Sequence, residues 1–255
     1  MRAPLLEAFL TVPLAHRALH DVANGRPENS RAAIRAAIDA GYGIEIDVQQ
    51  SADAQAMVFH DDALDRLANG SGPVRAQTAE QLAQVPLRGG DEGIPDLPEI
   101  LDLVAGRVPL LIEIKDQDGA MGPNIGPLEE AVAAALKSYD GPVAVMSFNP
   151  HSVMRMAALC PDVPRGLVTD GYDAAHWKLP AETCDRLRGI PDYDAAECSF
   201  ISHNMHDLTR ARVAALKAQG ASILCWTVKS PEDEAQARKI AQNITFEKYR
   251  AALPA

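Results

Sequence analysis

Residues 43–48 read GIEIDV, an alternation of apolar and acidic residues from which the interpretation of the whole chain starts. Successive side chains of a β-strand point to opposite faces, so Glu45 and Asp47 share one face and the three aliphatic residues share the other. We expect the aliphatic face to pack against helices and both carboxylates to point into an enclosed interior. A strand of a closed parallel barrel has these two environments.

Similar segments recur along the 255-residue chain and alternate with stretches of helical period. Strands are predicted over residues 11–15, 43–48, 56–60, 108–114, 143–148, 165–169, 199–203, 222–228 and 243–246. Helices are predicted over residues 30–40, 97–105, 127–139, 150–159, 207–219 and 231–241. About eight strand–helix units in a chain of this length predict an α/β fold, a TIM (β/α)8 barrel. An open, doubly wound sheet is the alternative, but the glycine-rich turn typical of its first strand is absent from residues 16–20, HRALH.

Residues 61–96 interrupt this alternation. The segment is rich in Gly, Pro and Asp and contains one short helical stretch near residues 78–83. We interpret it as a small insertion after the second strand region, within a single domain that spans residues 1–255. Residues 116–127 form a second irregular stretch directly after a strand. Both segments lie where barrels of this kind carry their active-site loops.

Composition restricts the classes of function. Asp and Glu total 35 against 24 Lys and Arg, a net charge of −11, which argues against a nucleic-acid-binding surface. The hydrophobic fraction of 47% argues against intrinsic disorder. No stretch approaches the roughly 20 apolar residues of a membrane span, and the chain starts without a secretory cleavage pattern, so no stable membrane insertion is expected. The four cysteines have no CxxC spacing and are expected as reduced thiols of a cytoplasmic protein.

A second strand repeats the acidic pattern. Residues 108–115 read VPLLIEIK, which puts Glu113 and Lys115 on one face at the carboxyl end of the strand. With Glu45 and Asp47, three carboxylates are expected in the barrel interior. Carboxylates buried together repel one another and lose hydration, and a divalent cation with oxygen ligands would relieve both penalties. The alternative is that Lys or Arg side chains on neighbouring strands neutralise them.

Two histidines complete a candidate catalytic set. His16 ends the first predicted strand and precedes Arg17, and His60 ends the third. Imidazoles exchange protons near neutral pH, whereas Arg17 and Lys115 can compensate the charge of a bound anion. Together with a metal-binding carboxylate cluster, these groups are what metal-assisted phosphoryl chemistry requires. Of the remaining histidines, we expect His203 to line the mouth of the barrel.

These residues lie in blocks that resemble the glycerophosphodiester phosphodiesterase family, in the family's order and over nearly the whole chain. The blocks are HR at 16–17, PENS at 27–30, IEIDV at 44–48, VFHD at 58–61, LDRLANGSG at 64–72, IPDL at 94–97, IEIK at 112–115, SFN at 147–149 and WTV at 226–228. Each block is modest alone, but the combination is highly specific. The segment VPRGL at 163–167, followed by HN at 203–204, is similar to the cytoplasmic bacterial branch.

The resemblance implies a TIM barrel that hydrolyses glycerophosphodiesters to sn-glycerol 3-phosphate and an alcohol such as choline or ethanolamine. It also implies one divalent cation, Mg²⁺ or Ca²⁺, with Mn²⁺ as a third candidate. The residues implied are Glu45, Asp47 and Glu113 as metal ligands, His16 and His60 as the acid–base pair, Arg17 and Lys115 as phosphate-binding groups, and Trp226 as a wall of the glycerol site.

The chain departs from the family pattern at three places near these residues. One is Asp116 after Lys115, where the family commonly has proline, so the following loop is expected to be looser. The family usually has glycine directly after His-Arg, where this chain has Ala18. Glycine allows a positive φ and a close backbone approach, so alanine is expected to reshape the floor of the phosphate site. The last predicted strand ends in TFE at 245–247, where many family members have Thr-Asp or Thr-Asn and then Pro.

Two other functions compete with this interpretation. A lysophospholipase D would need an apolar ramp or membrane-facing loops at the barrel mouth. Residues 61–96 contain leucines and valines, but they lack the basic face and the Trp or Phe of interfacial helices. A binding barrel without catalysis would be expected to have lost a carboxylate or a histidine, and this chain has all of them.

Overall fold

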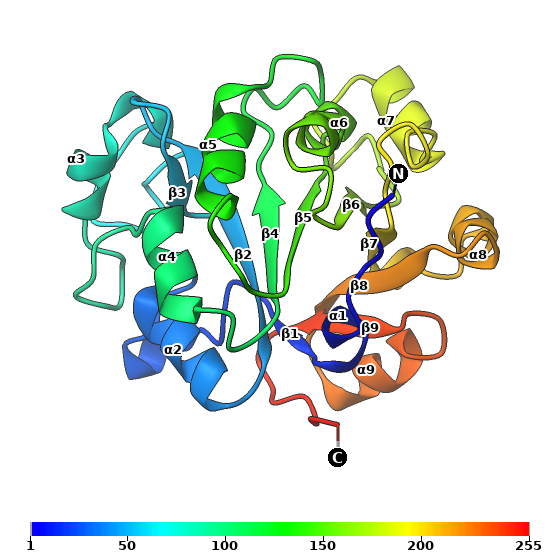
Figure 1. Cartoon of the computed structure of the whole chain (residues 1–255), viewed down its shortest axis with the longest axis horizontal. Helices are drawn as coiled ribbons and strands as arrows, with labels where there is room; N and C mark the ends of the chain where they lie inside the picture. The colour runs from blue at the N-terminus through cyan, green and yellow to red at the C-terminus, as the bar shows by residue number, and fades with distance from the viewer. Residues whose placement is uncertain (1, 255) are drawn as a thin grey trace.

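The computed structural model describes residues 2–254, so the two terminal residues of the predicted 1–255 domain lie outside the described part. Within residues 2–254, eight parallel strands form a closed barrel (Figure 1). They are β1 (Leu14–Ala15), β2 (Gly43–Gln50), β4 (Leu110–Ile114), β5 (Val143–Ser147), β6 (Arg165–Thr169), β7 (Phe200–Asn204), β8 (Ser222–Val228) and β9 (Asn243–Phe246). Strand β1 pairs with both β2 and β9 and closes the sheet. The predicted TIM (β/α)8 barrel is confirmed, and the open sheet is excluded.

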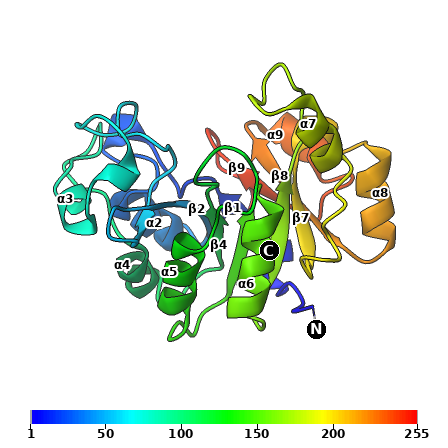
Figure 2. The ribbon, with the colours of Figure 1, turned by 90° about the horizontal axis from the view of Figure 1, so that it is seen from above.

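Helices surround the strands (Figure 2). They are α2 (Arg31–Asp39), α4 (Leu97–Val104), α5 (Pro127–Leu136), α6 (Pro150–Leu159), α7 (Ala181–Arg188), α8 (Ala211–Ala218) and α9 (Pro231–Ala237). Side-chain caps fix where several of them begin, because the first backbone N–H groups of a helix have no partner inside it. Ser30 accepts from the N–H of Ala33 in α2, and Asp96 accepts from the N–H of Glu99 in α4.

Apolar residues form separate layers on the two sides of the barrel wall. The aliphatic residues of β2 are buried in the outer layer between strands and helices, as the alternation at residues 43–48 predicts. The inner cluster comprises Phe9, Leu14, Leu111, Ala144, Met146, Val168, Phe200 and Leu224. Along β4 the inward positions run from Leu111 to Glu113, because alternate residues share a face. The acidic residues therefore lie toward the carboxyl-terminal side of this apolar filling.

Two predicted strands are corrected by the structure. Residues 11–15 yield only the two-residue β1, because residues 8–11 form the short helix α1 (Ala8–Thr11), which buries Phe9 inside the barrel. Residues 56–60 yield β3 (Ala56–Val58), which pairs antiparallel with β2 and stands outside the barrel. Residues 51–55 are too few for the crossover that a parallel neighbour requires, so the chain turns straight back.

The segment over residues 61–96 folds beside the barrel (Figure 1). It contains the 3-10 turn η2 (Val74–Ala76) and the helix α3 (Ala79–Ala83), close to the stretch predicted near residues 78–83. Thr78 and Gln81 form a capping box at the start of α3. The segment and the end of β3 share an apolar cluster of their own, made of Met57, Phe59, Leu64, Ala68, Val74, Leu82, Leu87 and Ile94.

Several helix boundaries also differ from the prediction. The helix predicted over 207–219 begins only at Ala211, after the 3-10 turn η3 (Met205–Asp207). Helices α5 and α9 end at Leu136 and Ala237, and a further 3-10 turn, η1, covers Val22–Asn24. Helix α7 is absent from the prediction, because Cys184 and Leu187 are the only residues that it buries.

The structure also bears on the predictions about membrane insertion and about the cysteines. No helix within residues 2–254 combines the length and the apolar run that a membrane crossing requires. The four cysteines, all in the described part of the chain, are free thiols, and three of them are buried.

Candidate active site

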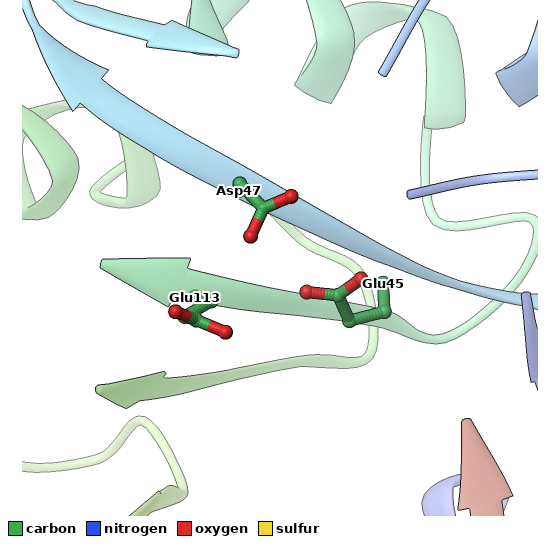
Figure 3. A group of neighbouring side chains, drawn as sticks. All are labelled: Glu45, Asp47 and Glu113. Atoms are coloured by element: carbon green, nitrogen blue, oxygen red, sulfur yellow. The ribbon is translucent and has the colours of Figure 1, made fainter. Parts of the chain in front are cut away.

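Three buried carboxylates meet inside the barrel. Glu45 and Asp47 project from β2 and Glu113 from β4, toward one another (Figure 3). Asp47 and Glu113 occupy paired positions in the parallel register of the two strands. One oxygen from each carboxylate lies within 4.8 Å of the others. The alternation of residues along β2 and β4 therefore places the cluster where the sequence predicts it.

Glu45 and Asp47 differ in electrostatic environment. Glu45 Oε2 accepts from the backbone N–H of Arg17 at 2.9 Å, whereas Oε1 is buried with no hydrogen-bond partner among the described residues. Burial, together with the nearby Asp47 and Glu113, raises the pKa of Glu45 well above its ordinary value. Burial also opposes ionisation of Asp47, but Lys115, His60 and Arg17 outweigh it and hold the pKa of Asp47 far below its usual range.

Two cations lie against the carboxylates. Lys115 Nζ is 2.7 Å from Asp47 Oδ1 and 2.6 Å from Glu113 Oε1. Although burial disfavours the ammonium, these two carboxylates raise the pKa of Lys115 above its ordinary value. Arg17 donates to Glu28 at 2.9 Å, and its Nε lies 3.7 Å from Asp47 Oδ2. Neutralisation by basic side chains is therefore realised at Asp47 and Glu113, while Glu45 keeps an unpartnered oxygen.

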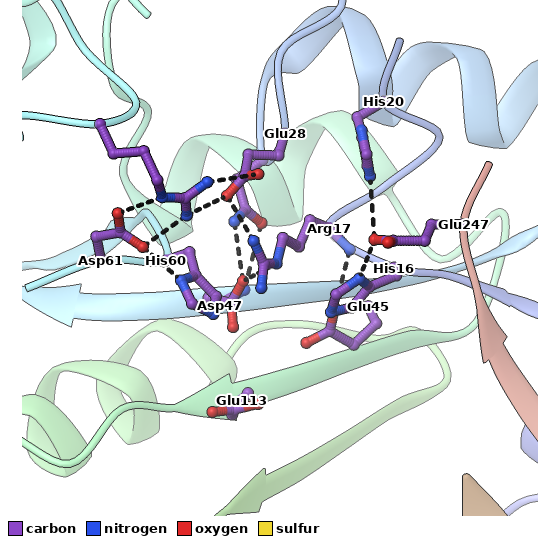
Figure 4. Close-up of polar contacts among 12 residues, drawn as sticks. His16, Arg17, His20, Glu28, Glu45, Asp47, His60, Asp61, Glu113 and Glu247 are labelled. Carbon is purple, nitrogen blue, oxygen red and sulfur yellow. Dashed lines mark hydrogen bonds and ion pairs between the residues drawn. The ribbon is translucent and has the colours of Figure 1, made fainter. Parts of the chain in front are cut away.

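Each of the two predicted histidines has a carboxylate at its Nδ1 (Figure 4). His16 Nδ1 is 2.7 Å from Glu247 Oε2, and His60 Nδ1 is 2.7 Å from Asp61 Oδ1. Hydrogen bonds from His60 and Arg66 outweigh the effect of burial and lower the pKa of Asp61. Burial lowers the pKa of His16, and the hydrogen bond to Glu247 opposes this effect. Both imidazoles are thus held by an acceptor on one side of the ring.

A cavity of about 90 Å³ joins these groups. Its lining comprises His16, Arg17, Glu45, Asp47, His60, Glu113, Lys115, Met146, Phe148, Val168, Trp226, Thr227 and Thr245. All eight residues that sequence reasoning selected are in this set. Phe148 and Trp226 meet edge to face at a centroid distance of 5.5 Å and form an apolar side of the cavity. The Trp226 indole N–H donates to the carbonyl of Ser202 at 2.9 Å, which fixes its ring.

The structure corrects the expectation for His203. Its side chain is fully buried, with Nδ1 2.7 Å from Thr169 Oγ1 and Nε2 3.2 Å from Asp207. It is absent from the cavity lining because hydrogen bonds hold both ring nitrogens away from it. His203 thus has a structural position rather than one at the mouth.

Sequence reasoning missed two polar residues that support the site. Asn29 Nδ2 donates to Asp47 Oδ2 at 3.0 Å, and Glu247 accepts from His16. Asn29 belongs to the block at 27–30, so its place among the blocks that resemble the family was a usable signal. Glu247 directly follows the last strand, which pairs with the first strand ahead of His16, so strand register was the signal there.

The backbone at the start of the site is in a left-handed conformation. Arg17 and Ala18 have φ values of 52° and 64°, a region that favours glycine. The N–H of Ala18 donates to the carbonyl of Glu45 at 2.9 Å, which ties this turn to β2. The departure from glycine noted in the sequence thus falls where glycine would be conformationally preferred.

Comparisons with known proteins agree on one family. The profile of the glycerophosphoryl diester phosphodiesterase family matches residues 16–244. The YhdW protein of Bacillus subtilis is 30% identical over 233 residues, and a glycerophosphodiester phosphodiesterase of Caldanaerobacter subterraneus is 29% identical over 233 residues; each match covers 88% of both chains. An Oleispira antarctica phosphodiesterase, solved in complex with the product sn-glycerol-3-phosphate, has a similar fold, with a TM-score of 0.77, 24% identity and 95% of both chains covered.

Proposed function

The chain belongs to the glycerophosphoryl diester phosphodiesterase family and is a phosphoric diester hydrolase; on this premise we propose that a divalent cation and two histidines assist its hydrolysis of glycerophosphodiesters. The products are sn-glycerol 3-phosphate and an alcohol. The observation that carries the proposal is the unpartnered, buried Oε1 of Glu45 beside Asp47 and Glu113. A buried carboxylate oxygen without a donor costs free energy that a cation would recover.

The residues present fit a divalent cation. Hard cations prefer oxygen ligands, and Glu45, Asp47 and Glu113 offer one oxygen each within 4.8 Å of the others. When bound, the cation would supply Lewis-acid polarisation of a phosphoryl oxygen. Mg²⁺, Ca²⁺ and Mn²⁺ all suit a set of three carboxylates. Lys115, which neutralises Asp47 and Glu113, would then compensate the charge of the phosphate as well.

The remaining polar residues have roles that follow from their contacts. Arg17 and Lys115 reach into the cavity from the ends of β1 and β4 and are proposed to bind the phosphate. His16 and His60 are proposed to transfer protons at Nε2, because a carboxylate occupies Nδ1 in each. One imidazole would take the proton of the hydroxyl as its oxygen bonds to phosphorus, and the other would protonate the alcohol oxygen as its bond to phosphorus breaks.

The apolar side of the cavity supports a place for the glycerol moiety. Trp226 and Phe148 present aromatic surface beside the charged groups, and Phe148 is also in contact with Trp177 at a centroid distance of 5.0 Å. The carbon face of a glycerol phosphate would pack on this surface while its phosphate meets the cations.

Release of sn-glycerol 3-phosphate from glycerophosphocholine tests the proposal. The reaction is run with EDTA and again after Mg²⁺ or Ca²⁺ is restored, with lysophosphatidylcholine as a parallel substrate. We expect release from the soluble diester that EDTA abolishes and the metal restores. Undiminished release in EDTA would contradict the metal requirement. Turnover of the lysolipid alone would instead identify a lysophospholipase D, and turnover of neither by folded protein would favour the binding barrel.

A further inference from the structure

Barrel closure places His16 and Glu247 side by side, although they lie 231 positions apart in the chain. In the parallel pair formed by β1 and β9, Leu14 faces Thr245 and Ala15 faces Phe246, so the next positions are His16 and Glu247. The N–H of His16 donates to the carbonyl of Phe246 at 2.9 Å, which extends the ladder to this point. The strand register therefore places the Glu247 carboxylate beside the His16 ring.

The carboxylate is held in place from both sides. Glu247 Oε2 is 2.7 Å from His16 Nδ1, while Oε1 is 3.1 Å from Lys229 Nζ (Figure 4 shows the histidine side). His20 Nε2 lies 3.6 Å from the same Oε2. The N–H of Glu247 donates to the carbonyl of Val228, so Lys229, at the end of β8, is also a neighbour by register. Lys229, Glu247 and His16 thus directly follow three adjacent strands of the barrel, β8, β9 and β1.

We infer that Glu247 is a positioning residue for His16, which keeps the proton on Nδ1 and leaves Nε2 for proton transfer to and from the substrate. An ionised carboxylate only accepts hydrogen bonds, so a short contact with Nδ1 requires that Nδ1 carries hydrogen. When Nε2 takes a proton, the ring becomes a cation and the adjacent Glu247 carboxylate stabilises it. The inference rests on the proposed function of His16 in acid–base catalysis.

His60 also has a carboxylate at Nδ1, but this carboxylate comes from the next residue in the sequence rather than from another strand. His60 is held by Asp61, its neighbour in sequence, and Asp61 is in turn held by Arg66 at 2.6 Å. His16 is followed by Arg17 and has no acidic neighbour in sequence, so its carboxylate must come from another strand. Glu247 at 12% side-chain exposure is well placed for this, because solvent competes little with the hydrogen bond.

The substitution Glu247→Gln tests the inference with little change of shape. We expect kcat for glycerophosphocholine to fall about 10–100-fold, the range seen for carboxylates that orient metal-binding histidines, while KM stays within about threefold. The ¹⁵N shifts of the His16 ring should report an Nδ1–H tautomer in the wild type and a shift toward Nε2–H in the variant. Glu247→Asp, which keeps the charge, should recover part of kcat.

Glu234→Gln is the matched control. Glu234 has a similar side-chain exposure of 14%, contacts Arg238 and Tyr249, and is outside the site. It should retain kcat and the His16 tautomer. An unchanged tautomer with wild-type kcat in Glu247→Gln would overturn the inference, as would a raised KM with unchanged kcat. If the wild type released no product, the proposed function would fail, while the tautomer comparison would still decide whether Glu247 sets the state of His16.

Discussion

Ala18 occupies a backbone conformation that is costly for a residue with a Cβ atom. Its φ of 64° lies in the left-handed region, and the residue is buried. Non-glycine residues held there store about 1–3 kcal/mol, and glycine removes this strain but adds freedom to the unfolded chain. We therefore expect Ala18→Gly to raise the free energy of unfolding by about 1 kcal/mol, measured by urea denaturation.

Ala33→Gly gives the contrast for that substitution. Ala33 is equally buried but lies in helix α2, where glycine costs about 1 kcal/mol relative to alanine. The two variants should move the unfolding free energy in opposite directions. A loss of stability in both would contradict the assignment of strain to Ala18.

Glu45→Gln separates the proposed metal site from the fold. Burial and two carboxylate neighbours raise the pKa of Glu45, so a neutral amide should be tolerated in the metal-free protein. We expect the unfolding midpoint of the EDTA-treated variant to match the wild type closely. Mg²⁺ or Ca²⁺ should raise the wild-type midpoint and leave that of the variant unchanged, because a ligand stabilises only the state that binds it. Equal metal-induced shifts in thermal unfolding would argue against Glu45 as a ligand.

Local sequence patterns were sufficient to predict the bounds of several helices and strands. The strands at 165–169, 222–228 and 243–246 and the helix at 150–159 have the predicted bounds, because their periodicity and caps are local properties. The short helix α1 around Phe9 could not be predicted, because it forms where Phe9 packs into the apolar interior of the barrel, and that interior depends on residues distant in sequence. The antiparallel β3 was misread because its composition resembles that of a barrel strand and only the short turn at 51–55 distinguishes it.

Asn243 joins the two ends of the chain, and its removal should cost stability. Its buried Nδ2 donates to the carbonyls of Phe9 and Val12 at 2.8 and 2.7 Å, which fastens α1 to the start of β9. Asn243→Ala would lose two hydrogen bonds, one of them buried, and remove the donor from the carbonyls of Phe9 and Val12. We expect a loss of about 3 kcal/mol in the free energy of unfolding, measured in urea.

The control for Asn243 is Gln236→Ala, which removes an amide from an exposed position of α9. Its effect should be within about 0.5 kcal/mol. If Asn243→Ala cost no more than this control, the clamp between α1 and β9 would contribute nothing to stability.

For the whole molecule, barrel closure decides what sequence could and could not predict about the site. The carboxyl ends of parallel strands meet at one end of a barrel, so the alternation on two strands and the histidines at strand ends predicted the charged residues and histidines of the cavity. Trp226 came from the family resemblance, and the other lining residues were not predicted. The ion pairs were not predictable, because Lys115 with Asp47 and Glu247 with His16 depend on which strands are neighbours and in what register. Although the chain has a net charge of −11, its buried acidic residues are paired with a few cations. The order of the strands in the barrel brings these cations next to the carboxylates.

This dependence on ionised carboxylates predicts how stability responds to acid. The hydrogen bond from His16 and the nearby His20 ring lower the pKa of Glu247 below the ordinary value of 4.5, and His60 and Arg66 lower that of Asp61. As the pH falls through this ordinary value, the unfolded chain binds protons that the folded chain does not. The stabilisation by these groups is therefore complete above about pH 5 and is lost as the pH falls toward their folded pKa values.

Glu247→Gln should lose this pH dependence in part. Its free energy of unfolding is expected to lie below that of the wild type at about pH 7. The difference should shrink by about pH 3.5, because the unfolded wild-type chain then binds a proton at Glu247 that the folded chain does not. Urea denaturation at both pH values measures the two differences, with Glu232→Gln at an exposed position of α9 as the control. Only a group whose pKa differs between the folded and unfolded states can change how the free energy of unfolding varies with pH. If the wild type and Glu247→Gln showed the same variation, the Glu247 carboxylate would contribute no stability that depends on its ionisation.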